Sequence, residues 1–509
     1  MNKGKAFAVN MAASILTFLI SFGISFLFTP YITAKVGGEA YGFVGLANNL
    51  INYVTIITVA LNSVAGRFIT VKYHQNRIEE ANQYFTSVLV ANALMAVIIS
   101  AVAIPFILVM EKVINIPVEI QTSVKLLFFF ILLNFVLTLI GTVYTTATFI
   151  TNKLYLSSIA NVIVALLKVF ILCLFFGFLE ADVAFIGVAT FASSLVGLII
   201  NMAYTQKLLP DIKLKKAYIS VQKTKELFMS GIWSSITKLS SILADGLDLI
   251  ITNLMISSYY MGQLSIAQTI PNYLVSLLGM ITSLFNPNLT KNYAQDNVPE
   301  LVSELKVSMK LTGFFTNILF SCVLVLGSYF YKLWVPNEDY TLIHQLTIVI
   351  MISTLTSGVT TGLSNIFLIT NKLKVNSIFW LFISMLDVVL VFILLNVTNW
   401  GIFAVAGVSK VVGLIVNLTY LPIYSAMCLK VKWTTFYPII FRYMATTVVM
   451  AVAFAGVRAI YGDANSWFSF LILLCICGVI GCLINYFMLF NKEEHKIVND
   501  RVLRIIRRK

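Results

Sequence analysis

The chain has 509 residues, of which 59% are apolar and only 11% are charged, and its mean hydropathy is +0.92. A soluble protein carries about a quarter charged residues, so this composition excludes a soluble protein and indicates a membrane protein. A formal net charge of +14 can indicate nucleic acid as a partner. Here the basic residues follow a membrane topology, so we expect no nucleic acid.

Fourteen apolar stretches follow one another along the chain with short connections between them. A helix needs about 20 apolar residues to cross a bilayer, and each stretch is that long. They cover residues 7–34, 43–69, 84–109, 122–149, 155–177, 183–206, 231–256, 261–287, 308–333, 341–369, 375–396, 401–427, 437–460 and 466–490. We therefore predict an all-α polytopic membrane protein of about 14 transmembrane helices, with no soluble catalytic domain. We expect no enzyme activity, no cofactor and no metal site.

The basic residues predict the orientation of these helices. If the N-terminus lies inside and the spans alternate, 25 Lys and Arg residues fall in inside segments and five in outside segments. Basic loops are retained on the cytoplasmic side of a membrane. Both termini are therefore predicted to be cytoplasmic.

An internal repeat divides the chain. The sequence Ile-Thr-Asn-Lys-Leu occurs at 150–154 and again at 369–373, an offset of 219 residues. Residues 196–204 align with 412–420 with six of nine identical. Gly42, Ala47, Asn52 and Tyr53 match Gly262, Ala267, Asn272 and Tyr273 at an offset of 220. Such duplication is typical of transporters that bind substrate between two halves.

The repeat predicts the domain boundaries. We expect an N-terminal six-helix bundle at 1–206, a cytoplasmic linker at 207–230, a C-terminal six-helix bundle at 231–428, two additional transmembrane helices at 429–491 and a basic cytoplasmic tail at 492–509. Because six spans separate equivalent positions, the two repeats are parallel. The linker mixes basic and apolar residues, which favours the membrane surface. The tail is either an interfacial helix or a solvated basic segment.

Polar residues recur every three or four positions along the seventh span. They are Ser234, Lys238, Ser241, Asp245, Asp248 and Thr252. A charge at mid-membrane costs at least ~2.5–3.5 kcal/mol, so we interpret this face as part of a substrate cavity. Asp245 and Asp248 are candidates for ion coupling, by sharing a proton or binding a cation. The alternative is an internal ion pair in which Lys238 compensates an aspartate.

The first span carries a milder, uncharged stripe at the equivalent positions. It consists of Asn10, Ser14, Thr17, Ser21 and Ser25, and Ser14 and Ser21 match Ser234 and Ser241 at the offset of 220. Two symmetry-related helices with polar faces predict a water-filled cavity between the halves.

Further polar residues within the spans extend the candidate cavity. Arg67 either reaches lipid phosphates or receives an incoming pyrophosphate. Asn52 and Asn272 are repeat-equivalent amides, and Pro271 before the second is expected to kink its helix; plain interhelical hydrogen bonding is the alternative. Lys410 is a mid-helix cation. Lys168 and Asp387, 219 residues apart, are expected to make structural charge pairs.

The arrangement resembles a known superfamily. Two parallel six-span halves, a basic linker and two extra C-terminal spans resemble the multidrug/oligosaccharidyl-lipid/polysaccharide (MOP) exporters. The Val64-Ala65-Gly66-Arg67-Phe68 end of the second span, followed by Ala81-Asn82-Gln83, is similar to the O-antigen-type polysaccharide-biosynthesis flippases. The resemblance implies a MATE-like pair of bundles in the bacterial cytoplasmic (inner) membrane that alternates between inward-open and outward-open states.

The resemblance also implies a substrate and partners. It implies flipping of an undecaprenyl-pyrophosphate-linked oligosaccharide, an anionic lipid-linked cargo, for surface polysaccharide such as O-antigen lipopolysaccharide. Membrane lipids, H⁺ or Na⁺ and other polysaccharide-assembly membrane proteins are the expected partners. The chain has no G-x-x-x-x-G-K motif for ATP, so a gradient or consumption of the product must drive the movement.

Three alternatives remain open from the sequence. A cation-coupled multidrug exporter of the same superfamily would use Asp245 and Asp248. A lipid II flippase is disfavoured, because such flippases carry arginines in the first span and here no charge lies between Lys5 and Lys35. A non-transporting scaffold for polysaccharide enzymes is the third.

Overall fold

The computed structural model describes residues 3–370 and 372–490, and this part of the chain contains helices and no β-strand. The all-α prediction is confirmed. The basic tail predicted at 492–509 lies outside the described residues. The chain divides into two compact units, and each is described by itself.

Unit 1 consists of Met1–Ser265 and Ser377–Val388. Its helices are α1 (Lys3–Val36), α2 (Gly38–His74), α3 (Ile78–Val109), α4 (Gln121–Gly141), α5 (Thr146–Ile150), α6 (Leu154–Phe178), α7 (Ala184–Leu208), α8 (Val221–Ser241), α9 (Asp248–Met255) and most of α10 (Ser258–Ala267). Three 3₁₀ turns, η1 (Met110–Lys112), η2 (Val118–Ile120) and η3 (Lys216–Tyr218), and one π-helical turn, η4 (Ile242–Gly246), complete it.

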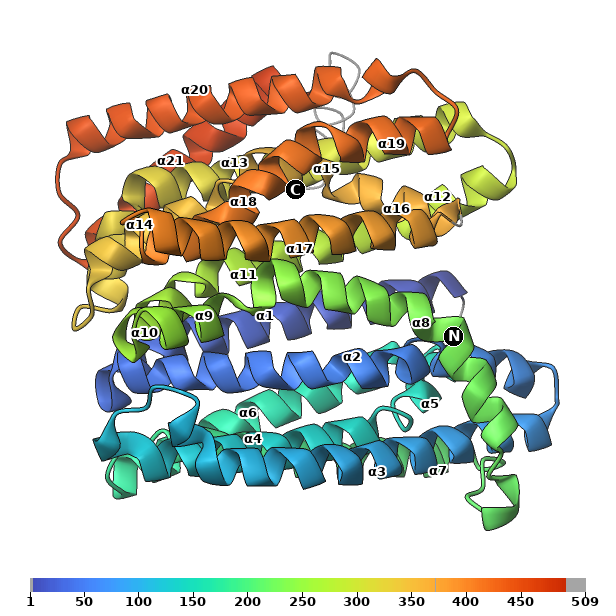
Figure 1. Cartoon of the computed structure of the whole chain (residues 1–509). Coiled ribbons are helices and arrows are strands. Elements are labelled where there is room, and N and C mark those ends of the chain that lie inside the picture. The colour runs from blue at the N-terminus through green and yellow to red at the C-terminus, as the bar shows by residue number, and fades with distance from the viewer. Residues whose placement is uncertain (1–2, 371, 491–509) are drawn as a thin grey trace, which may run out of the picture. The chain divides into compact units, whose positions relative to one another are not determined.

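The long helix α2 is the centre of unit 1. It contacts α1, α3, α4, α5, α8 and α9, and α4 packs along both α3 and α7 (Figure 1). Leu61, Ala65 and Ile69 of α2 are buried in one cluster with Tyr84 and Phe85 of α3. Because lipid tails are as apolar as these side chains, close packing holds the helices together within a membrane.

Unit 2 consists of Ile266–Asn376 and Val389–Lys509. Its helices are α11 (Thr269–Ser283), α12 (Asn286–Ala294), α13 (Val298–Trp334), α14 (Tyr340–Met351), α15 (Thr354–Thr360), α16 (Asn365–Ile369), most of α17 (Leu373–Val397), α18 (Ile402–Leu418), α19 (Tyr420–Cys428), α20 (Tyr437–Tyr461) and α21 (Trp467–Leu489). The 3₁₀ turns η5 (Thr361–Ser364) and η6 (Trp433–Thr435) lie between them.

The two additional C-terminal helices, α20 and α21, pack on α13 and on each other. A buried polar group joins all three helices. The Asn317 amide donates to Asn485 Oδ1 at 3.0 Å, the Thr447 hydroxyl donates to Asn317 Oδ1, and Asn485 donates to the Phe314 carbonyl at 3.1 Å. Interhelical amide bonds of this kind hold helices together where lipid supplies no partner.

The number of spans is close to the expectation. Among the described residues twelve helices are long and apolar enough to cross a membrane, and the bent pair Tyr340–Met351 and Thr354–Ile369 makes a thirteenth. The fourteenth expected span, 231–256, does not meet the same test. There the chain is divided into α8, η4 and α9 and carries the polar residues singled out above.

The first copy of the repeated Ile-Thr-Asn-Lys-Leu forms the corner between α5 and α6. Asn152 adopts a left-handed conformation with φ 53°, which asparagine tolerates better than most residues. The second copy lies between α16 and α17, and its Asn371 is outside the described residues.

Candidate functional site

Helix α8 carries the centre of the candidate site, and small residues fix it against α2. Gly231 lies so close to the backbone of Ala60 that an added Cβ would stand 1.8 Å from the Ala60 carbonyl oxygen. Four residues later the Ser235 hydroxyl donates to the Ile56 carbonyl at 2.6 Å. Glycine permits this close approach because it has no side chain. Lys238 comes seven residues, about two turns, after Gly231 and so lies near the same side of α8, toward α2.

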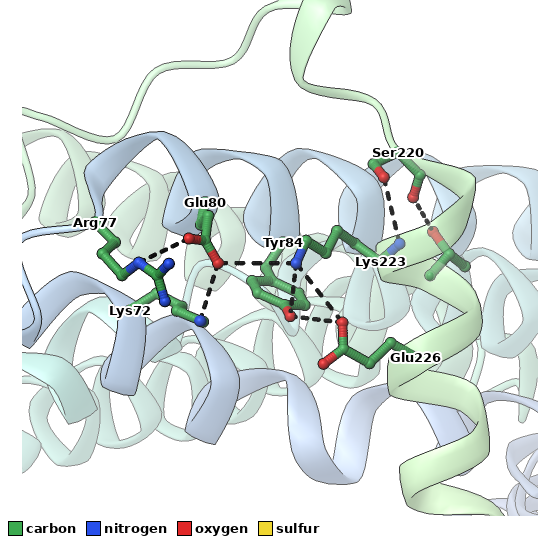
Figure 2. A network of polar contacts seen from close by, with 8 residues as sticks. Lys72, Arg77, Glu80, Tyr84, Ser220, Lys223 and Glu226 are labelled. Carbon is green, nitrogen blue, oxygen red and sulfur yellow. Dashed lines mark hydrogen bonds and ion pairs between the residues drawn. The ribbon is translucent and has the colours of Figure 1, made fainter.

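A network at the start of α8 anchors that helix to α2 and α3 (Figure 2). Lys223 Nζ donates to the Tyr84 hydroxyl at 3.2 Å and lies 4.8 Å from the centre of its ring, and Tyr84 donates to Glu226 at 2.8 Å. Glu80 pairs with Lys72 at 2.9 Å and with Arg77 at 2.8 Å. Sequence reasoning missed this network, because its members lie about 140 residues apart.

The linker before α8 is also fastened to α3. The Asn82 side chain accepts from the backbone N–H of Lys213 at 2.8 Å and donates to the Asp211 carbonyl at 3.2 Å. Ser87 Oγ accepts from the backbone N–H of Ser220 at 2.9 Å. Asn82 belongs to the Ala-Asn-Gln triplet noted in the sequence, and it satisfies backbone groups of a segment without regular structure.

The polar face of α8 is exposed within unit 1 and includes two of the predicted residues in direct contact. Lys238 Nζ donates to Asn52 Oδ1 of α2 at 3.3 Å. Asn52, Ser241 and Asp245 are exposed and Lys238 is half-buried. We define the α2–α8 polar face as Asn52, Arg67, Lys238, Ser241 and Asp245.

Arg67 lies further along α2 than Asn52. It is exposed, and its guanidinium carbon lies 5.5 Å from the centre of the Phe68 ring. Fifteen residues of helix separate the two positions, about 22 Å at 1.5 Å per residue. The two cations of the polar face therefore stand well apart along its length.

A π-helical turn ends α8 and separates the two predicted aspartates. η4 covers Ile242–Gly246, and the Gly246 carbonyl accepts hydrogen bonds from Tyr53 at 2.5 Å and Asn49 at 3.3 Å. Asp245 is exposed, whereas Asp248 is only 6% exposed and lies in the first turn of α9. A helix N-terminus stabilises a carboxylate, so the two aspartates occupy different environments.

Asn49 and Tyr53 are site residues that sequence reasoning did not select. Tyr53 was visible only as part of the repeat match with Tyr273. π-helical turns are often found at functional sites, and this one depends on donors from another helix.

The helix that the sequence predicts to be kinked by Pro271 is interrupted just before that residue. α10 ends at Ala267 and α11 begins at Thr269. Proline cannot accommodate the carbonyl four residues before it, and that carbonyl, of Ala267, accepts instead from the Thr347 hydroxyl at 3.2 Å. Asn272 is exposed on α11, where the Ser276 hydroxyl donates to its carbonyl at 2.9 Å. The carbonyl that Pro271 leaves free thus has a partner in α14.

The remaining predicted residues lie on three other helices. Lys410 is half-buried on α18, Lys168 is half-buried on α6, and Asp387 is 3% exposed on α17. Charge pairing of Lys168 and Asp387 stays a prediction. In the part of the chain that the structure describes, no three His, Cys, Asp or Glu side chains are grouped so as to hold a metal ion.

Comparisons with known proteins place this geometry in a family. Residues 7–292, more than half of the chain, match the family described as polysaccharide biosynthesis protein. The uncharacterized membrane protein EpsK of Bacillus subtilis (strain 168) is 26% identical over 505 residues, which cover 97% of this chain and 98% of that protein.

Solved structures share the fold. The lipid II flippase MurJ, in an inward closed conformation, matches with a TM-score of 0.66 at 14% identity, over 94% of this chain and 98% of that one. An outward-facing multidrug resistance MATE family transporter of the MOP superfamily matches with a TM-score of 0.62 at 15% identity, over 83% and 95%. The MATE-like fold is confirmed, and the chain is a multi-pass membrane protein that belongs to the polysaccharide biosynthesis protein family.

Proposed function

We propose that this protein flips an undecaprenyl-pyrophosphate-linked oligosaccharide across the bacterial cytoplasmic membrane by alternating access, for surface polysaccharide biosynthesis. The observation that supports the proposal is the α2–α8 polar face, where Lys238 contacts Asn52 of the neighbouring helix and Arg67 is exposed further along α2. Such residues are costly within a membrane and usually serve a substrate path.

Arg67 and Lys238 both suit the anionic, oxygen-rich head of such a cargo. Arginine binds phosphate with two parallel N–H donors. The Lys238 ammonium has three donors, one of which meets Asn52. Asn52 is a neutral partner, so this contact does not compensate the positive charge of Lys238 as a carboxylate would. Ser241 adds a hydroxyl on the same exposed face.

The rest of the proposal follows from the chemistry of the cargo. The head of the glycolipid is large, polar and anionic, so it needs a polar path through the membrane, while the prenyl tail can stay in lipid. No bond is broken, so no catalytic residue or cofactor is required. A gradient of H⁺ or Na⁺, or consumption of the product outside, supplies the direction. Lys410 and Asn272 of unit 2 are proposed to contact the same cargo.

Deletion of the gene with complementation tests the proposal. Loss of the protein should stop surface polysaccharide and leave a lipid-linked oligosaccharide in the inner leaflet, measured by mass spectrometry of lipid extracts and by protection from an added glycosidase. Lys238→Ala should fail to restore polysaccharide at normal protein level, while Lys238→Arg should restore part of it.

A matched control lies on the same helix. Lys225 is exposed near the start of α8, thirteen residues before Lys238, and Lys225→Ala should behave as wild type. Normal polysaccharide from both Lys238→Ala and Lys410→Ala would contradict a cation-lined path. Accumulation of a different lipid intermediate would reject the substrate but keep the flippase.

The second candidate is a cation-coupled multidrug exporter. The exposed carboxylate of Asp245 favours it, since a cationic drug or a coupling ion could reach that group. It predicts that overexpression lowers the accumulation of a cationic dye and that Asp245→Asn abolishes this effect. Unchanged dye accumulation on overexpression would exclude it.

A further inference from the structure

A pocket of about 580 Å³ opens between α13 and the added helix α20, within unit 2. The polar side chains that line it are Arg458, Tyr329 and Asp463, and its small residues are Ala455, Ala459 and Gly462. It lies at the end of α20 that the distribution of basic residues predicts to be outside. The repeat does not account for α20, and the proposed flippase site does not use this pocket.

Arg458 forms the cationic wall of the pocket in a fixed position. Its Nη1 donates to the Val325 carbonyl at 2.7 Å and its Nε donates to the Tyr329 hydroxyl at 3.2 Å. The guanidinium carbon lies 4.5 Å from the centre of the Tyr329 ring, a favourable cation–π distance. A guanidinium has five N–H donors, and these two bonds leave donors for a ligand while the side chain stays in place.

Asp463 supplies an opposite charge next to Arg458. Its Oδ1 accepts from the same Tyr329 hydroxyl at 2.6 Å, so one hydroxyl separates the carboxylate from the guanidinium. Gly462 ends α20 and allows the chain to turn so that Asp463 reaches Tyr329. Its backbone has φ 81° and ψ −157°, a conformation open essentially only to glycine. The pocket therefore presents one fixed cation and one fixed anion side by side.

An exposed apolar stripe leads along α20 into the pocket. Val448 and Val452 are 61% and 68% exposed, and Ala455 and Ala459 follow on the same helix face at spacings of three and four. From Val448 to Ala459 the helix rises about 16 Å at 1.5 Å per residue. That is about half of the ~30 Å hydrocarbon core, the depth of a single leaflet.

We propose that this pocket binds a phospholipid whose headgroup carries both a phosphate and a primary amine. The phosphate meets Arg458, the ammonium meets Asp463, and an acyl chain lies along the stripe from Val448 to Ala459. A headgroup with phosphate alone leaves the carboxylate facing an anion. A quaternary amine fills the same place but donates no hydrogen bond to the carboxylate.

Native mass spectrometry of the purified full-length protein tests the assignment. The protein is exchanged into detergent with equal amounts of phosphatidylethanolamine, phosphatidylglycerol and phosphatidylcholine, and the retained lipids are counted. Wild type should retain phosphatidylethanolamine in preference to the other two. Arg458→Gln should lower retention of all three about tenfold, the loss expected for charge-assisted bonds. Asp463→Asn should remove the preference and leave phosphatidylglycerol bound.

Two further variants keep the result interpretable. Lys332 is exposed and donates to Asn465 at 3.3 Å near the same end of α13 but does not line the pocket, so Lys332→Gln should bind lipid as wild type does. Arg458→Lys keeps the charge and should retain phosphate lipids if Arg458→Gln does not fold. Equal retention of all three lipids by wild type, or an unchanged preference in Asp463→Asn, would overturn the proposal.

Discussion

Helices α1 and α8 begin the two sequence repeats, both belong to unit 1, and their polar residues are used in different ways. In α1 the polar groups bond within the protein: the Asn10 amide donates to the carbonyl of Asn152 at 3.1 Å and its Oδ1 accepts from the Tyr155 N–H at 3.0 Å. Thr17 donates to the Ala13 carbonyl of its own helix at 2.8 Å. These bonds hold a corner of the fold.

In α8 and η4 the equivalent stripe carries charges, with Lys238 half-buried and Asp245 exposed. Lys238 stands where α1 has Phe18, and Asp245 stands where α1 has Ser25, at the repeat offset of 220. Both helices keep serines at the matching positions 14 and 234. The polar stripe of the first repeat thus makes hydrogen bonds that stabilise the fold. The stripe of the second repeat carries the charges on which the proposed function rests.

The largest expected effect concerns how closely a glycine of α8 and a glycine of α1 are packed against neighbouring residues. Gly231→Ala places a methyl group 1.8 Å from the backbone oxygen of Ala60, whereas Gly23 of α1 has nothing within 4 Å of an added Cβ. Overpacking costs roughly 1–3 kcal/mol where side chains can shift, and here backbone must move. Gly231→Ala should therefore lose most folded protein and Gly23→Ala should lose none, measured by size-exclusion chromatography of tagged protein. Equal yields would show that α8 does not depend on this contact.

The next effect is on transport and not on folding. Lys238→Ala should lower flipping about tenfold or more, because a charge-assisted hydrogen bond contributes about 1.5–3 kcal/mol, while the amount of protein stays constant. The measurement is transfer of a fluorescent lipid-linked oligosaccharide in proteoliposomes. Lys238→Phe introduces into α8 the residue that α1 has at the equivalent position, Phe18, and should be equally inactive. Activity in that variant would show that flipping does not need the charge of Lys238.

Elements set by local composition could be predicted from the sequence. The length of the apolar stretches alone predicted the twelve helices that are long and apolar enough to span a membrane, and the bent thirteenth. Pro271 marked the place where a helix is interrupted, because the effect of proline on a helix is local. The pairing of positions in α1 and α8 by the repeat register stays a prediction.

Features made by distant residues could not be predicted. The π-helical turn at Ile242–Gly246 depends on Tyr53 and Asn49, about 190 residues earlier, and nothing in the turn's own sequence signals it. As a result the even spacing of Asp245 and Asp248 does not put both on one exposed face. The hydrogen bonds between Asn82 and the linker could not be predicted either. A segment of basic and apolar residues is equally compatible with lying on the membrane surface.

A smaller effect tests the structural use of polar groups in α1. Asn10→Ala removes the side-chain bonds to Asn152 and Tyr155, and a buried group left without its partner costs about 1–3 kcal/mol. Thermal unfolding in detergent should shift downward, with flipping per folded molecule unchanged. Ser14→Ala is the matched control, because the Ser14 hydroxyl donates to the Asn10 carbonyl one turn away on the same helix, and it should shift unfolding little. A loss of flipping in Asn10→Ala at full stability would place α1 in the substrate path.

The smallest effect is expected at Asp245, and it tests whether this carboxylate couples transport to an ion. Asp245→Ser introduces the residue of the first repeat, and because the carboxylate is exposed, its loss should change oligosaccharide flipping by less than about threefold, in line with the ~1 kcal/mol or less of an exposed charge interaction. If Asp245 couples transport to an ion, the same variant should instead lose the dependence of the rate on an imposed Na⁺ or H⁺ gradient. Measuring the rate with and without each gradient separates these outcomes. Asp248→Asn provides the comparison, since that carboxylate is buried at the start of α9 and its loss should appear in stability and not in gradient dependence.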